Sequence, residues 1–122
     1  METAGTASPR AGLRRETLAE RTVITISGDL DIASAPALRE PLETALRDAG
    51  PLVVIDLSEV TFCDASGLAL LTGARRLTEP EGVTLVLAAP RPHMARLLRV
   101  SGLSRLFAVR PAGTASVRSA AA

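Results

Sequence analysis

One hydroxyl group in the sequence has a setting in which it could be chemically modified. Ser66 lies in the segment Asp-Ala-Ser-Gly-Leu at residues 64–68, which follows an apolar run at 53–57 and leads into a helical pattern. A helix N-terminus stabilises an anion, because its first N–H groups lack intrahelical acceptors and the helix dipole is positive there. Ser66 could therefore accept a phosphoryl group, which would add a charge of about −1.5 to −2 beside Asp64.

Simpler structural roles are open for the same residues. A serine just before a helical pattern is often the N-cap, which binds a free backbone N–H, so Ser66 has this alternative. Asp64 and Asp31 each follow an apolar strand, and their carboxylates are either solvated turn groups or groups that act near the serine. Gly67 lets the backbone turn or lets another segment approach closely. The sequence leaves both kinds of role open.

The sequence lacks the residue sets of the common catalytic and metal sites. The Gly-x-Ser-x-Gly pattern of a hydrolase nucleophile fails around Ser66, because Asp64 and Leu68 stand where it needs glycine. The one histidine, His93, lies in a Pro-His-Met context typical of the first turn of a helix. With one histidine and one cysteine no Cys/His metal cluster can form, and Cys63 is expected to be a small core residue. We predict no catalytic residues, no metal and no cofactor, and hence no enzyme.

Composition points to a protein that binds neither nucleic acid nor membranes. The 122 residues carry 14 basic and 13 acidic side chains, a formal charge of +1, and the arginines are expected to be interspersed with acids. Two phenylalanines, with no tyrosine or tryptophan, offer no stacking platform for bases. No window approaches the about 18 uninterrupted apolar residues of a membrane helix, and no signal-peptide pattern opens the chain. We expect a cytoplasmic location.

Hydrophobic periodicity predicts strands that alternate with helices. The strands are expected at residues 13–18, 22–27, 52–57, 83–87 and 106–109, and the helices at 34–49, 68–79 and 90–102. This order implies an α/β fold with a mixed, mainly parallel sheet of about four to five strands packed with three to four helices. We expect one domain at 13–110 between flexible tails at 1–12 and 111–122.

Two features of the pattern bear on packing. Ser34 is the expected N-cap of the first helix, with Pro36 in its first turn. Pro41 removes a hydrogen bond from a helix interior, so this helix is either kinked there or regular only after a later start. The near-continuous apolar run at 52–57 is typical of a strand covered on both faces, and we expect helices to flank it.

The chain resembles the STAS-domain family of anti-sigma factor antagonists over about residues 13–109. The segments that carry the resemblance are Ile-Ser-Gly-Asp-Leu-Asp at 26–31, Val-Ile-Asp-Leu-Ser-Glu-Val-Thr-Phe at 54–62, Asp-Ala-Ser-Gly-Leu at 64–68 and Val-Ser-Gly-Leu at 100–103. The Asp-x-Ser-Gly-Leu segment is fairly specific when Gly-Asp-Leu-Asp precedes it at this distance. The resemblance implies a STAS-type fold.

The resemblance also implies a regulatory switch without enzymatic activity. Such proteins bind an anti-sigma factor, often a serine kinase of the histidine-kinase-like ATPase fold, and so free a sigma factor. The kinase inactivates them by phosphorylating the serine that matches Ser66, and a phosphatase acting on phospho-Ser66 restores them. Ala65 stands where many members have Ser or Thr, which removes a competing acceptor. The site and flanking residues matched in this way are Ser66, Asp31, Asp64, Ala65, Gly67 and Leu68.

The resemblance leaves other functions to be weighed. The helix at 34–49 and the helix after Ser66 form the expected docking face, on a monomer or weak dimer. STAS-like modules also occur as constitutive docking subunits in lipid-transport systems, anion transporters and stress-sensing assemblies, which is the alternative without phospho-switching. A third possible function is that of a small hydrolase, which would be supported by hydrolytic turnover that is lost when Ser66 is replaced.

Overall fold

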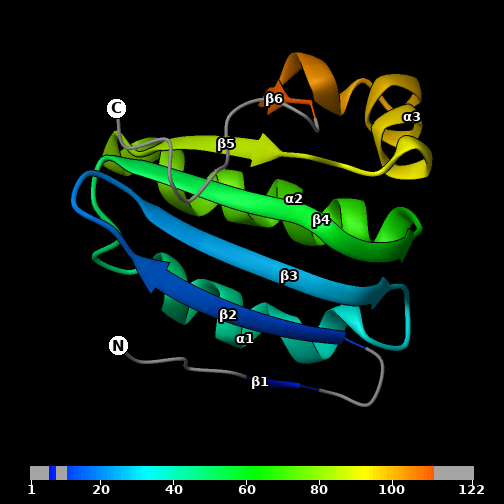
Figure 1. The fold of residues 1–122 in the computed structure, drawn as a ribbon, viewed down its shortest axis with the longest axis horizontal. Coiled ribbons are helices and arrows are strands. Elements are labelled where there is room, and N and C mark those ends of the chain that lie inside the picture. The colour runs from blue at the N-terminus through cyan, green and yellow to red at the C-terminus, as the bar shows by residue number, and fades with distance from the viewer. Residues whose placement is uncertain (1–5, 8–10, 112–122) are drawn as a thin grey trace.

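Strands and helices alternate through the computed structural model, which describes residues 6–7 and 11–111 (Figure 1). The strands are β1 (Thr6–Ala7), β2 (Ala11–Thr17), β3 (Thr22–Leu30), β4 (Leu52–Cys63), β5 (Thr84–Ala88) and β6 (Ala108–Arg110). The helices are α1 (Ala35–Leu46), α2 (Ala65–Thr78) and α3 (Pro92–Val100), with 3-10 turns η1 (Glu79–Glu81) and η2 (Leu103–Arg105). Most of both predicted tails, 1–12 and 111–122, lies outside the described residues. Of the N-terminal tail, residues 6–7 form β1 and residues 11–12 begin β2, and of the C-terminal tail only residue 111 is described.

The strands form one mixed sheet whose spatial order follows the chain. β1 pairs with β2 and β2 with β3 in antiparallel fashion, whereas the pairs β3 with β4, β4 with β5 and β5 with β6 are parallel. In the centre of the sheet Ile24 pairs with Ile55, and Ile55 pairs with Leu87. The described sheet has six strands, β1 being a two-residue addition to the predicted ones. The predicted α/β fold with a mixed, mainly parallel sheet is confirmed.

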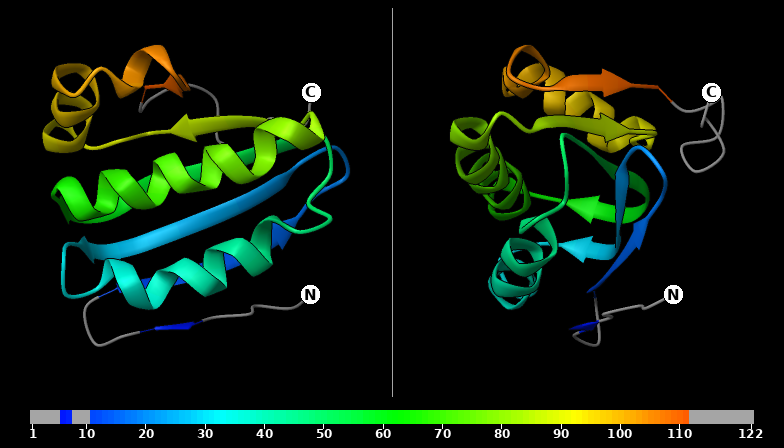
Figure 2. Two further views of the ribbon diagram at one scale, coloured as in Figure 1. Left: turned by 180° about the vertical axis from the view of Figure 1, so that it is seen from behind. Right: turned by 90° about the vertical axis from the view of Figure 1, so that its left-hand side faces the viewer.

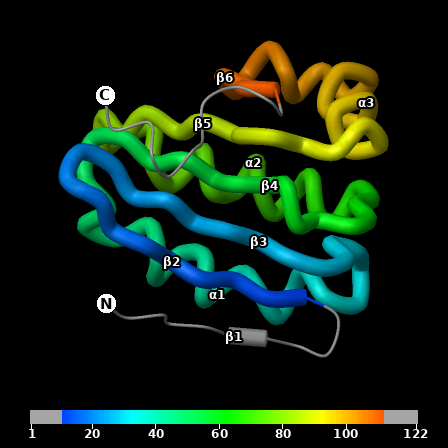
Figure 3. The backbone as a smooth tube through the Cα atoms, in the orientation of Figure 1, coloured from blue at the N-terminus to red at the C-terminus, as the bar shows by residue number. Residues whose placement is uncertain are grey.

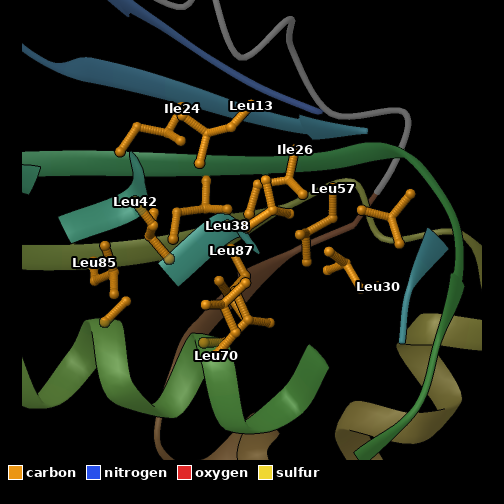
Figure 4. Packing of buried hydrophobic residues seen from close by; sticks show 14 of the residues in the cluster. Leu13, Ile24, Ile26, Leu30, Leu38, Leu42, Leu57, Leu70, Leu85 and Leu87 are labelled. Carbon is orange, nitrogen blue, oxygen red and sulfur yellow. The ribbon is translucent and has the colours of Figure 1, made fainter. Parts of the chain in front are cut away.

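Helices cover one face of this sheet (Figure 2). Side chains of the strands, such as Ile24 and Ile26, and of the helices, such as Leu38 and Leu70, meet in one apolar layer (Figure 4). The opposite face carries a smaller buried cluster made of strand residues alone, Val23, Val54, Val86 and Ala88. The expectation that helices flank β4 on both faces is wrong for the described residues. Parallel crossovers of the usual hand that advance in one direction across a sheet leave their helices on the same face.

Helix α1 accommodates a proline in its interior. It begins at Ala35, directly after Ser34, with Pro36 in its first turn, so the alternative of a later start is wrong. It continues through Pro41 and ends at Leu46, a few residues before the expected end. Because Pro41 has no N–H, the carbonyl of Ala37 lacks the donor that an α-helix normally supplies four residues on.

Replacing Pro41 should stabilise the fold. Pro41→Ala restores an N–H to the helix, and we expect the free energy of unfolding to rise by about 1–3 kcal/mol in urea denaturation. Pro36→Ala is the matched control, because proline fits the first turn, and it should change stability by less than about 0.5 kcal/mol. A loss of stability in Pro41→Ala would mean that the packing of the proline ring outweighs the missing hydrogen bond.

Candidate functional site

The connections that lead from parallel strands into helices lie at one end of the sheet (Figure 3). They are residues 31–34 after β3, Asp64 after β4 and residues 89–91 after β5. The carboxyl ends of parallel strands are where α/β folds usually place ligands and functional groups. The predicted site residues Asp31, Asp64 and Ser66 all lie at this end.

The start of α2 differs from the simplest expectation for Ser66. Asp64 has extended backbone angles and is the N-cap: its Oδ1 accepts the N–H of Ser66 at 2.8 Å. The carbonyl of Asp64 accepts the N–H of Leu68 at 3.1 Å, which is the first helical bond. Ser66 is thus the second residue of the helix, and the interpretation of its hydroxyl as the cap is wrong. Asp64 is the cap because it directly precedes the helix, where its carboxylate can accept hydrogen bonds from the free N–H groups of the first turn.

This arrangement leaves the hydroxyl of Ser66 available. Its side chain is partly exposed, and within the described residues its Oγ takes part in no hydrogen bond. The N–H groups of Ala65 and Gly67 likewise have no acceptor in that part of the chain. Together with the helix dipole they favour an anion at this point, whereas the Asp64 carboxylate opposes one. A phosphoryl group on Ser66 would therefore be held locally and would concentrate negative charge.

Gly67 allows α2 to sit directly on the end of β3. A Cβ atom at this position would lie 2.6 Å from Cys63 Sγ and 2.8 Å from both the Cβ and the carbonyl oxygen of Leu30. The same Leu30 carbonyl accepts the N–H of Asp64 at 3.1 Å. Only glycine fits here, so the motif's glycine has a steric reason. Of the two neighbours in the motif, Ala65 is exposed and Leu68 packs partly buried against the core.

Asp31 organises the neighbouring loop. Its Oδ1 accepts the N–H groups of Ala33 and Ser34, each at 3.0 Å. The Ser34 hydroxyl accepts the N–H of Asp31 at 3.1 Å and donates to the carbonyl of Asp29. Asp31 is buried, with 8% of its surface exposed, so the alternative of a solvated turn carboxylate is wrong for it. Ser34 precedes α1 as predicted, but its side chain bonds back into the loop instead of capping the helix.

Two exposed apolar side chains at this end were missed by sequence reasoning. Ile32, at the tip of the Asp31 loop, is 76% exposed, and Phe62 is 44% exposed. The Phe62 ring stacks on His93 of α3, with centroids 5.7 Å apart and an angle of 15° between the planes. The exposure of Ile32 could have been predicted, because this isoleucine lies inside a turn-forming segment. The position of Phe62 depends on strand register, which local sequence does not reveal.

The expected docking face of α1 and α2 carries a groove. Its volume is about 230 Å³, and its rim includes the half-exposed Leu77. The lining residues are Arg39, Leu42, Glu43, Leu46, Ala69, Leu70, Gly73, Ala74, Arg76 and Leu77. A larger groove of about 580 Å³ lies between β2 and α1, where Pro36 and Pro41 form one wall, and it contains none of the predicted site residues.

Cys63 lies beneath the site, in contact range of Gly67. It is buried, and its Sγ donates a weak hydrogen bond to the carbonyl of Asp64 at 3.4 Å. Burial, helped by the charge of Asp64, raises the pKa of the thiol to about 11. The prediction of a core cysteine is confirmed. Among the described residues no group of His, Cys, Asp and Glu could hold a metal ion, and none of their helices is long and apolar enough to cross a bilayer.

Comparison with known proteins agrees with this geometry. Residues 13–110 match the family model described as Mlab, STAS domain. The chain belongs to the STAS domain family. The anti-sigma-B factor antagonist of Listeria monocytogenes is 31% identical over 87 residues, which are 71% of this chain and 76% of that protein. The predicted resemblance to the anti-sigma factor antagonists is thereby confirmed.

Solved structures of this STAS family resemble the chain closely. An anti-sigma factor antagonist from Mycobacterium paratuberculosis has a TM-score of 0.76 at 28% identity, over 87% of this chain and 91% of that one. SpoIIAA, the Bacillus cell fate determinant, is 25% identical over 80% of this chain. Its unphosphorylated form has a TM-score of 0.66 over 86% of that chain, and its phosphorylated form has a TM-score of 0.60 over 89%.

The steric role of Gly67 can be tested against a second glycine of the same helix. Gly67→Ala must displace the backbone of Leu30, and we expect it to lower the free energy of unfolding by about 1–3 kcal/mol. A Cβ at Gly73 meets nothing within 4 Å, so Gly73→Ala should raise that free energy by up to about 1 kcal/mol. Equal effects of the two changes in urea denaturation would contradict the close approach of α2 to β3.

The reactivity of Cys63 follows from its raised pKa. A shift from 9.0 to about 11 lowers the thiolate population at pH 8 about a hundredfold, so iodoacetamide should alkylate the folded protein at least that much more slowly than the unfolded chain. Mass spectrometry in buffer and in denaturant measures both rates. Similar rates in the two conditions would show that the thiol is accessible and ionised in the fold.

Proposed function

We propose that this chain is an anti-sigma factor antagonist that is switched off by phosphorylation of Ser66. In this proposal it binds an anti-sigma factor and thereby releases a sigma factor. The observation that carries it is the Ser66 hydroxyl, partly exposed and unbonded at the start of α2, because Asp64 has taken over the cap. The names of its relatives and the phosphorylated form of SpoIIAA support the same function.

The chain acts as a substrate in the switching reaction. A kinase of the ATPase fold, which is the anti-sigma factor itself, transfers the γ-phosphoryl group of ATP to Ser66: the Oγ–P bond forms, the bond to ADP breaks, and the hydroxyl proton leaves to a base of the kinase. A phosphatase hydrolyses phospho-Ser66 and returns the hydroxyl and inorganic phosphate. No catalytic group or cofactor of this chain takes part.

Charge explains why the modification would prevent binding. The unmodified surface around Ser66 combines the exposed apolar side chains Ile32 and Phe62 with the carboxylate of Asp64. Phosphorylation adds a charge of about −1.5 to −2, which must be desolvated and which repels acidic groups of a docked partner. Because the free N–H groups of Ala65 and Gly67 accommodate the phosphate, α2 need not unfold. The switch is local and electrostatic.

The proposal includes the setting in which the switch operates. The protein is expected in the cytoplasm, where sigma factors act, as a monomer or weak dimer. The domain at 13–110 would then present the carboxyl end of its sheet, together with α1 and α2, to the anti-sigma factor.

Variants of Ser66 test the switch. The protein is incubated with γ-³²P-ATP and an ATPase-fold anti-sigma factor encoded near its gene. The label should appear on the wild type and not on Ser66→Ala. Ser66→Ala adds no charge to the surface and should still bind the anti-sigma factor. Ser66→Asp should weaken binding about tenfold or more in calorimetry, because it places a charge beside Asp64. The control is Thr84→Asp. Thr84 is exposed at the start of β5, so this change adds the same charge at the opposite end of the sheet.

The outcomes separate the two candidate functions. Label on Ser66→Ala equal to that on the wild type would exclude Ser66 as the acceptor. Binding that is insensitive to Ser66→Asp, together with an absence of label on the wild type, would instead favour a constitutive docking subunit of a lipid-transport, transporter or stress-sensing assembly.

A further inference from the structure

The charge of the chain is divided unevenly along its length. All 13 acidic residues lie at or before Glu81, so every charged residue after it is basic. The expectation that arginines and acids are interspersed is therefore wrong for the last third of the chain. The arginines of this part that the structure describes are Arg91, Arg96, Arg99, Arg105 and Arg110.

The fold gathers these arginines at one edge of the molecule. α3, η2 and β6 lie together beyond β5, at the edge of the sheet away from β1 (Figures 1 and 2). Met94 and Leu98 bury one side of α3, which leaves Arg96, Arg99 and Val100, at helical spacings of three and four, on its exposed side. We call the exposed surface of residues 96–110 the basic edge.

The basic edge combines unpaired charge with exposed aliphatic side chains. Within the described residues Arg96, Arg99 and Arg105 form no ion pair, whereas Arg14 and Arg75 are each paired with a glutamate. Val100 is 76% exposed and Leu106 is 48% exposed. The second of these is anchored, because Arg75 Nε donates to its backbone carbonyl at 3.0 Å. The basic edge thus presents positively charged and apolar side chains side by side, and the described part of the chain supplies neither carboxylates for the arginines nor apolar cover for Val100 and Leu106.

We propose that the basic edge binds an acidic segment of a second protein, one that carries apolar side chains among its carboxylates. Guanidinium groups bind carboxylates in a bidentate manner, and Val100 and Leu106 need apolar contacts from the same partner. A nucleic-acid backbone offers the charge but not the apolar contact, and the edge has no aromatic residue that could stack on bases. A bilayer needs a larger apolar face than a nine-residue helix with one exposed aliphatic side chain presents.

The basic edge and the Ser66 site are separate surfaces, and α3 runs from one to the other. The first turn of α3 carries His93, which stacks on Phe62 at the site end of the sheet, whereas Val100 is the last residue of the helix. The chain would thus contact two proteins at once, one at the start of α2 and one at the basic edge. The inference does not depend on Ser66 being phosphorylated.

Charge reversal tests the basic edge with a defined probe. The full chain is titrated against a fluorescein-labelled peptide of alternating Glu and Leu, and binding is followed by anisotropy. We expect binding that weakens as salt is raised from about 50 mM to about 500 mM. The double change Arg96→Glu with Arg99→Glu should weaken it about tenfold or more, and Val100→Ser should weaken it without altering the salt dependence. Arg15→Glu with Arg47→Glu, in β2 and directly after α1, is the matched control, because these two arginines lie away from β6 and outside the groove between α1 and α2.

Other occupants of the surface give distinct results. The proposal is overturned if the peptide does not bind, or if the control pair weakens binding as much as the Arg96 and Arg99 pair. Tighter binding to random single-stranded RNA, or to vesicles of phosphatidylglycerol and phosphatidylcholine, would also overturn it. So would self-association in sedimentation velocity that Arg96→Glu abolishes, because the occupant would then be a second copy of the chain.

Discussion

The arrangement of the site depends on the close seating of the first turn of α2 on the end of β3. The carbonyl of Leu30 receives the N–H of Asp64, and Gly67 passes so near to Leu30 that no side chain fits between them. This contact fixes where the helix begins. It also brings the loop after β3 and the start of α2 to the same end of the sheet, so that the loop of Asp31 lies at the end that carries Ser66.

The two acidic residues at this end of the sheet have different structural roles. Asp31 is buried and uses its carboxylate to close the loop between β3 and α1. Asp64 caps α2 and so frees the hydroxyl of Ser66 from the capping role that a serine would otherwise take. A cap that carries a full negative charge also sets the local potential. An anion at Ser66 would be supported by the helix N-terminus and opposed by the Asp64 carboxylate two residues before it.

Packing and hydrogen bonds in the rest of the fold hold the elements of this end in place. Helices α1 and α2 cover the same face of the sheet, and the core between them is closed by side chains such as Leu38 and Leu70. α3 is tied to β4 by Arg91, whose Nε donates to the carbonyl of Ser58 at 2.8 Å. Its outer side is therefore held in place but left uncovered by the described chain, and this is where the unpaired arginines collect.

The sequence by itself determined the elements and the motif. Alternating β-branched residues at 22–27 and the apolar runs around Ile55 and Leu87 identify strands, and Ser34 with Pro36 marks the start of α1, because such signals act between neighbours in the chain. Gly67 and Ser66 could be singled out for the same reason. Tertiary structure alone decided that Asp64 is the cap, that helices cover one face, and that Ile32, Phe62 and the arginines of α3 are exposed. These features depend on contacts between residues far apart in the chain, such as the one between Leu30 and Gly67, and no local pattern encodes them.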